Sequence, residues 1–169
     1  EYPSRANLPI RVMPFDGGNP VETQDGLQSC SGNAVTSLIE IVLADNVQRS
    51  RLFAYYNGRI VEGRTGVDEG VTSLRDVVKA VQAYGVCAEF YWPYISSNVN
   101  ERPADIAYQN AKEVATQLKT YSRCKTLAAV KTAIADGYPV VFGFYIPPEM
   151  FTDFVFDPGY VLPIPQAIN

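Results

Sequence analysis

The sequence predicts an α+β fold in which several helices come first and β-strands follow. Capped stretches with the apolar spacing of helices fill much of residues 30–135. A run of β-branched and aromatic residues then occupies 138–146, which is typical of a buried strand. The apolar content of 47% over 169 residues is enough for one domain or two small lobes.

Residues 1–24 are predicted to form an extended arm, because the Gly17-Gly18 pair and four prolines oppose a long helix: Pro3, Pro9, Pro14 and Pro20. The stretch 34–44 is apolar on nearly all sides, as a helix in the middle of a domain is. Ser29 has the side chain of an N-cap, so Cys30 is predicted on the first turn of this helix. Unpaired N–H groups and the positive end of the helix dipole would stabilise a thiolate there.

Two further helices are marked by their cap residues. Ser50 can cap a short helix that we expect to end at Gly58. Ser73 and Asp76 form a capping box, and Gly85 is expected to end the helix that follows.

The later part of the chain mixes helices with predicted strands. Pro103 is expected to begin an amphipathic helix, and Thr126 to cap another that ends at Gly137. Strands are predicted over 118–122 and 138–146. The helix after Thr126 is predicted to turn three apolar side chains inward: Leu127, Val130 and Ile134.

Composition excludes several classes of function. A net charge of −4 and a pI near 4.8 argue against a nucleic-acid partner. No apolar run approaches the roughly 20 residues of a membrane span, so we expect a soluble protein without a membrane partner. The three cysteines are far apart, with no histidine and no Cys-x-x-Cys, which argues against a zinc site. Nothing in the sequence predicts a cofactor. The chain starts at Glu1 without a methionine, so we expect that an upstream region is missing from it.

The segment from Gln24 to Ala34 resembles the active-site segment of papain-like (C1-type) cysteine peptidases. The bacterial, archaeal and phage branch has a Gln-Gly-Ser-Leu-Gly-Ser-Cys-Thr-Ala-Asn-Ala type of segment. Matching residues are Gln24, Leu27, Ser29, Cys30, Asn33 and Ala34. Gly26 stands one place later than expected, Gln28 replaces a glycine, and Ser31 stands where plant and animal members have tryptophan.

This resemblance implies that Cys30 is a catalytic nucleophile and that the Gln24 amide contributes to the oxyanion hole. The alternative is that Cys30 is a small core residue, as most free cysteines are. Cys87 and Cys124 lack such surroundings and are interpreted as core or surface thiols.

A second block, with a Gly-bearing loop, a helix, Tyr84-Gly85-Val86 and then Trp92-Pro93-Tyr94, also resembles this family. The resemblance implies a helical left lobe with a central helix, formed with the arm by residues 1–116. Residues 117–169 would begin an incomplete β-barrel right lobe. It also implies that one wall of the groove for a peptide or protein substrate contains Glu69, Gly70, Val71 and Thr72. The alternative is that these residues form a turn without a ligand. The resemblance is compatible with a bacterial cytoplasm or a virion.

The sequence contains no histidine. A peptidase of this type needs an imidazole to take the thiol proton and later to protonate the leaving amine. In the papain-like pattern the histidine and its asparagine partner fall about 130–150 residues after the cysteine. Counted from Cys30, that window extends beyond Asn169, so the pattern is incomplete here.

Three interpretations therefore remain open. The chain is the N-terminal part of an active peptidase, and a companion polypeptide or a missing C-terminal segment supplies the histidine and asparagine. Alternatively, it is an inactive papain-like module with a structural or binding role in a larger assembly. In the third interpretation the resemblance misleads, and the chain is an unrelated α+β domain.

Overall fold

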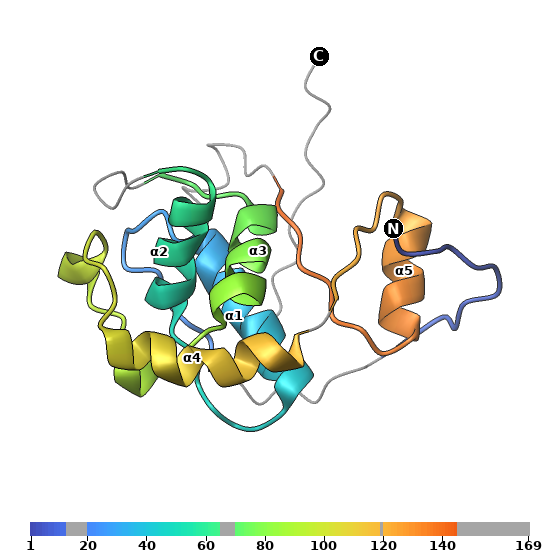
Figure 1. Cartoon of the computed structure of the whole chain (residues 1–169). Coiled ribbons are helices and arrows are strands. Elements are labelled where there is room, and N and C mark those ends of the chain that lie inside the picture. Colours follow the sequence, from blue (N-terminus) through green and yellow to red (C-terminus); the bar gives the residue numbers. More distant parts are fainter. Residues whose placement is uncertain (13–19, 65–69, 119, 145–169) are drawn as a thin grey trace, which may run out of the picture.

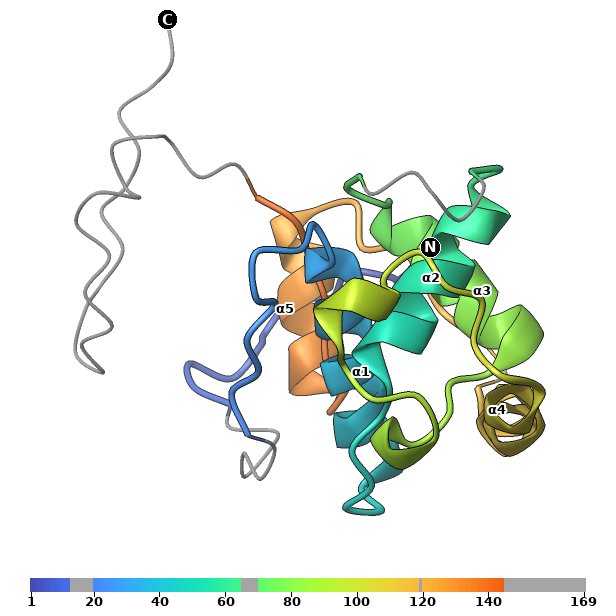
Figure 2. The ribbon, with the colours of Figure 1, turned by 90° about the vertical axis from the view of Figure 1, so that its left-hand side faces the viewer.

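The computed structural model of the chain describes residues 1–12, 20–64, 70–118 and 120–144 (Figure 1). Helices α1 to α4 gather into one group, whereas α5 lies apart from them with the N-terminal residues beside it (Figure 1). Figure 2 views the first group from the side away from α5. In the part of the chain that is described, no helix is long and apolar enough to cross a membrane. The helices are α1 (Cys30–Leu43), α2 (Arg51–Val61), α3 (Leu74–Tyr84), α4 (Asp105–Gln117) and α5 (Leu127–Ala135), with short 3₁₀ helices η1 (Glu89–Tyr91) and η2 (Ser96–Asn98).

The first four helices enclose a common apolar core. Helix α2 packs against α1 and α3, and α3 packs against α4. Removal of these side chains from water is the main force that holds the group together. The buried core residues are Val35, Ile39, Phe53, Ala54, Val77, Val81, Val86, Cys87, Ala107, Ala111 and Val114.

The cap signals in the sequence mostly predicted the helix ends correctly. Ser50, Ser73 and Thr126 each accept a hydrogen bond from the backbone N–H three residues later, at the starts of α2, α3 and α5. Gly85 ends α3 with φ +79°, a conformation that favours glycine. The arm is also free of helix in its described residues, 1–12 and 20–24.

The predicted end of α2 at Gly58 is wrong, because the helix continues to Val61. A Cβ at Gly58 would lie 2.7 Å from Cγ2 of Val77, so this glycine allows α3 to approach α2 closely. The prediction for α5 is also wrong at Leu127, which is 69% exposed. The buried face of α5 is the one against which the arm lies, where the Arg5 N–H donates to Oγ1 of Thr132 (3.2 Å).

The strands predicted over 118–122 and 138–146 are absent from the described residues of these ranges, and 119, 145 and 146 lie outside the description. Within the described ranges the β pairing is limited to one isolated bridge, between Arg49 and Ala88. A strand requires a neighbouring strand to satisfy its N–H and C=O groups, and none is described beside 138–144. The apolar side chains of this segment instead remain open, with Phe142 70% and Phe144 60% exposed. The β-barrel lobe is therefore not seen in the described residues.

Candidate active site

Cys30 is the first residue of α1, and its side chain is exposed. Cys87 is buried in the helical core, and Cys124 is intermediate in its exposure to solvent. The hydrogen bonds of α1 begin where the Asn33 N–H donates to the Ser29 carbonyl (3.0 Å). The N–H groups of the residues before Asn33 therefore form the positive end of the helix around the thiol.

The position of Cys30 depends on close packing of α1 against α2. A Cβ at Gly32 would lie 2.8 Å from both the Arg51 carbonyl oxygen and the Tyr55 Cβ. Real side chains do not approach so closely, so glycine at residue 32 allows the first turn of α1 to rest on the backbone of α2. Cys30 is thus fixed relative to α2 by the helix geometry.

A tight turn from Gln24 to Leu27 precedes Cys30. The Leu27 N–H donates to the Gln24 carbonyl (2.9 Å), and both central residues have positive φ, Asp25 at +46° and Gly26 at +78°. The Gln24 side chain folds back over this turn, where its Nε2 donates to the Leu27 carbonyl (2.7 Å). Gln24 has no hydrogen bond to Cys30 in the described structure, but Nε2 carries a second hydrogen that the Leu27 bond does not use.

The hydroxyl of Tyr94 holds both ends of the loop between the turn and the helix. It donates to the Gln24 carbonyl (2.9 Å) and shares a 2.5 Å hydrogen bond with Oγ of Ser29. The Ser29 hydroxyl also accepts from Nδ2 of Asn33 (3.0 Å). Ser29 is therefore at the predicted N-cap position, but its side chain does not cap the backbone of α1.

Arg51 lies beneath this loop at the start of α2, and only 8% of it is exposed. Its Nη1 donates to the Thr23 carbonyl (2.8 Å) and lies 3.0 Å from a carboxylate oxygen of Glu22. Its guanidinium carbon is 4.1 Å from the ring centroid of Tyr94, within the range of a cation–π contact. Two weaker contacts join it to Asn33 (3.4 Å) and Glu89 (3.7 Å).

Sequence reasoning missed Arg51 and Tyr94 as residues of the site. The available signal for Arg51 was a charged residue directly after the Ser50 cap, and this signal does not identify a partner. Burial raises the pKa of the Glu89 carboxyl, and the nearby Arg51 guanidinium opposes that shift.

The predicted groove wall is partly described. Glu69 lies outside the described residues, whereas Gly70, Val71 and Thr72 lead into α3. The Tyr55 hydroxyl donates to the Gly70 carbonyl (2.9 Å), and the Gly70 N–H donates back to that hydroxyl (3.2 Å). Thr72 is buried and Val71 is exposed. The structure thus anchors Gly70 to α2, and Val71 presents its side chain to solvent.

Neither Cys87 nor a cluster of metal ligands offers a competing reactive site among the described residues. Burial raises the pKa of the Cys87 thiol to about 12, so this cysteine stays protonated near neutral pH. Among the described residues, no group of three or more His, Cys, Asp or Glu side chains could hold a metal ion.

Comparisons with known proteins give two relatives, and no family model matches the chain. The uncharacterized peptidase C1-like protein L477 of Acanthamoeba polyphaga mimivirus is 33% identical over 137 residues, which cover 73% of this chain and 43% of that protein. The crystal structure of xylellain, a cysteine protease from Xylella fastidiosa, matches with a TM-score of 0.70 and 28% identity over 80% of this chain. The match covers 58% of the xylellain chain, so the present chain spans about half the length of these relatives.

Proposed function

Since the chain belongs to the papain-like (C1-type) peptidase family and shares its fold, we propose that it is the part of a cysteine peptidase that carries the nucleophile. The observation that carries the proposal is the exposed Cys30 thiol at the N-terminus of α1, beside a loop that Arg51 of α2 and Tyr94 hold in place. Peptide or protein chains are the proposed substrates.

The proposed reaction is acyl transfer through a thioester. The Cys30 thiolate forms a bond to the peptide carbonyl carbon, and the electron pair of the C=O bond moves onto oxygen. The Cys30 N–H and the second Nε2 hydrogen of Gln24 stabilise this oxyanion. The C–N bond then breaks as the leaving amine takes a proton, and water hydrolyses the thioester.

In this proposal Gly70, Val71 and Thr72, with Glu69, form one wall of the substrate groove. Tyr55 already engages both backbone groups of Gly70. Nη2 of Arg64 also donates to the Gly70 carbonyl (3.2 Å), so both lone pairs of this oxygen already have donors. An extended peptide that pairs with Gly70 would therefore have to displace Tyr55 or Arg64.

The imidazole for this reaction must come from outside the 169 residues, because they contain no histidine. General acid–base transfer contributes about 10²–10⁴-fold to such reactions. We propose that a continuation of the chain or a companion polypeptide supplies the histidine, its asparagine partner and the remaining strands of a β lobe. The partial coverage of both relatives supports this view.

One pair of observations favours a second candidate, an inactive papain-like module with a structural or binding role. The chain has no histidine, and the Gln24 amide donates to Leu27 rather than toward the thiol. In that case the groove would bind a protein segment without cleaving it.

Mass spectrometry after treatment with a peptidyl diazomethyl ketone distinguishes the two candidates, provided that the chain is treated together with its continuation or companion polypeptide. A peptidase should be labelled on Cys30 and not on Cys124, and labelling should disappear in Cys30→Ala but persist in Cys124→Ser. In the assembled peptidase, Cys30→Ala should abolish hydrolysis, and Gln24→Ala should reduce the rate roughly 10²–10³-fold. Absence of labelling in that assembled protein, while Cys30 still reacts with iodoacetamide, would favour the inactive module. Full hydrolysis by Cys30→Ala would exclude the proposed reaction.

A further inference from the structure

We propose that Arg51 and Tyr94 are positioning residues that hold the Gln24 turn against the first turn of α1 and so assemble the oxyanion site. The inference rests on the proposed function, because it assigns these two residues a role in that same site.

Arg51 connects the loop to the helices through several groups at once. Its guanidinium donates to the carbonyl of Thr23, the residue directly before Gln24. It also forms an ion pair with the carboxylate of Glu22. The same group reaches Asn33 on α1, whose amide in turn binds Ser29. One side chain of α2 therefore contacts the backbone before the segment 24–29 and the Asn33 side chain after it.

Tyr94 closes the same segment from the other side. Its hydroxyl lies between the Gln24 carbonyl and the Ser29 side chain, so it fixes the distance between the oxyanion donor and the residue before Cys30. Its ring stacks on the Arg51 guanidinium, and its backbone N–H is held by Glu89 (2.6 Å). The two side chains thus support each other as well as the loop.

Stability alone does not account for the burial of Arg51 and Glu89. Burying an arginine and a glutamate carries a desolvation cost that is recovered only when all their polar atoms have partners. Here Nε of Arg51 and Oε2 of Glu89 are buried without hydrogen-bond partners among the described residues. An apolar side chain at residue 51 would pack at lower cost, but it would not hold the Thr23 carbonyl or Glu22.

Arg49 provides a matched control. It is 7% exposed, lies two residues away, and its guanidinium pairs with Asp45 rather than with the loop 22–29. Arg49→Met therefore removes a buried arginine of equal size without releasing Gln24.

A competition assay on the chain itself tests the proposal at pH 9, where a thiolate forms without help from an imidazole. The probes are iodoacetamide, which alkylates sulfur without forming an oxyanion, and a peptide aldehyde, which forms a hemithioacetal through one. In the aldehyde reaction the S–C bond forms, the carbonyl electron pair moves to oxygen, and water supplies the proton.

Arg51→Met should raise the aldehyde concentration that protects Cys30 by about 10²-fold, the lower end of the effect of losing one oxyanion donor. The rate of alkylation without aldehyde should change less than about twofold, since that reaction needs no oxyanion donor.

Tyr94→Phe, which keeps the stacked ring, should raise the protecting concentration about tenfold, because only the hydroxyl that closes the loop is lost. Arg51→Lys should restore part of the loss, and Arg49→Met should leave both measurements unchanged. Tyr94→Phe keeps the test decisive if Arg51→Met does not fold.

Equal protection of the wild type, Arg51→Met and Tyr94→Phe by the aldehyde would overturn the positioning role while leaving the proposed function intact. A wild-type chain that the aldehyde does not protect, although iodoacetamide labels Cys30, would overturn the proposed function and this inference with it.

Discussion

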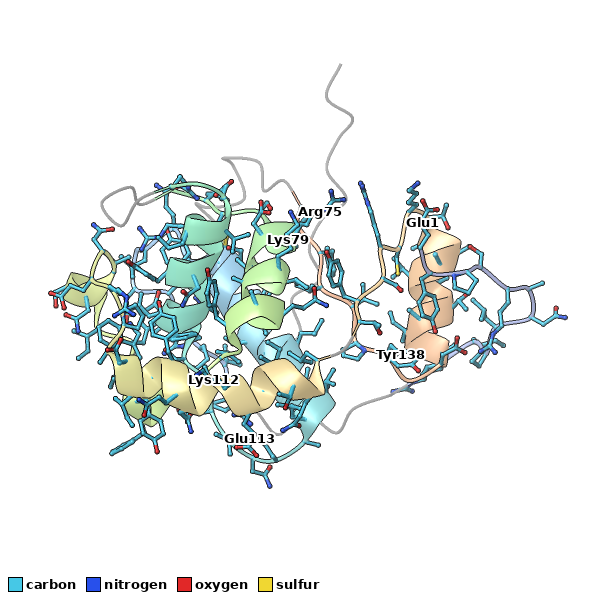
Figure 3. All side chains as sticks on the ribbon, in the orientation of Figure 1. Glu1, Arg75, Lys79, Lys112, Glu113 and Tyr138 are labelled. Carbon is cyan, nitrogen blue, oxygen red and sulfur yellow. The ribbon has the colours of Figure 1, made fainter. Side chains whose placement is uncertain are left out.

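Helices α1 to α4 and the region around α5 are held by different kinds of contact. The first group shares an apolar core of fully buried side chains. The α5 region is tied to the arm mainly by polar groups at the surface. The Tyr2 hydroxyl donates to Asp136 (2.8 Å), Arg5 forms an ion pair with Asp136 (2.5 Å), and Lys125 pairs with Glu1. Figure 3 shows Glu1 and Tyr138 beside α5.

The difference shows which part can be stable alone. Apolar burial contributes about 25 cal/mol per Å², whereas an exposed ion pair contributes about 0–1 kcal/mol. Helix α1 belongs to the first group, but its face away from α2 borders an apolar hollow of about 280 Å³ that residues 139–142 line on the other side. The helix that carries the candidate nucleophile therefore packs into the core of the first group on one side and borders the apolar hollow on the other.

Truncation of a phenylalanine should have its largest effect in the first region. Phe53→Ala removes a fully buried ring from the core and should lower the free energy of unfolding by about 3–5 kcal/mol. Phe142→Ala removes a ring that is 70% exposed and should change it by less than about 0.5 kcal/mol. Urea denaturation followed by circular dichroism measures both. Similar losses in the two variants would mean that residues 138–144 are packed as firmly as α2.

Thiol reactivity sharpens the same comparison. The pKa of Cys87 is raised from 9.0 to about 12 by burial, which lowers its thiolate fraction at pH 8 by about 10³ relative to an ordinary thiol. Cys87 should therefore react with a disulfide reagent only upon unfolding, whereas Cys30 and Cys124 react in the folded chain. Rapid labelling of Cys87 in Cys30→Ser/Cys124→Ser would show that the core opens readily.

The raised pKa of Cys87 also has a consequence for stability. The folded state holds this proton more tightly than the unfolded state does, so the contribution is complete below about pH 9 and is lost as the pH rises toward 12. The free energy of unfolding should fall across this range, and Cys87→Ala should remove that part of the decrease. A Cys87→Ala chain with the same pH profile as the wild type would contradict the assignment.

Two glycines after helices offer a further test. Both have positive φ, Gly85 at +79° after α3 and Gly137 at +86° after α5. A Cβ at Gly85 would lie 1.7 Å from the Ala111 carbonyl oxygen, whereas one at Gly137 meets no atom within 4 Å. Alanine at either position is strained by the positive φ. Gly85→Ala should lower the free energy of unfolding by about 1–3 kcal/mol more than Gly137→Ala, because α4 must move. Equal thermal unfolding temperatures would show that α4 is not packed tightly on α3.

Local signals explain what the sequence could predict. The caps at Ser50, Ser73 and Thr126 each involve groups three residues apart, so short-range chemistry reveals them. The same kind of pattern predicted Cys30 at the start of α1 correctly, although the Ser29 side chain makes no cap hydrogen bond there.

Long-range packing explains what the sequence could not predict. The bond between Tyr94 and Gln24 joins residues 70 positions apart, and Gly58 serves a neighbouring helix rather than ending its own. Strand propensity at 138–144 was not sufficient either, since a strand also requires a partner.

The smallest expected effect concerns the contact between the arm and α5. Asp136→Ala removes the acceptor that Tyr2 and Arg5 share, and because these groups are partly exposed the loss should be about 0.2–1 kcal/mol. Hydrogen exchange should accelerate by up to about fivefold at the Tyr2 and Arg5 amides, which donate to the Arg123 carbonyl and to Thr132, because opening of the arm exposes them. Asp105→Ala, which removes an exposed ion pair between the first residue of α4 and Arg102, should leave those amides unchanged. If Asp136→Ala also accelerated exchange within α1 to α4, the two regions would unfold as one cooperative unit, and polar contacts at the arm would contribute to the stability of the helix that carries Cys30.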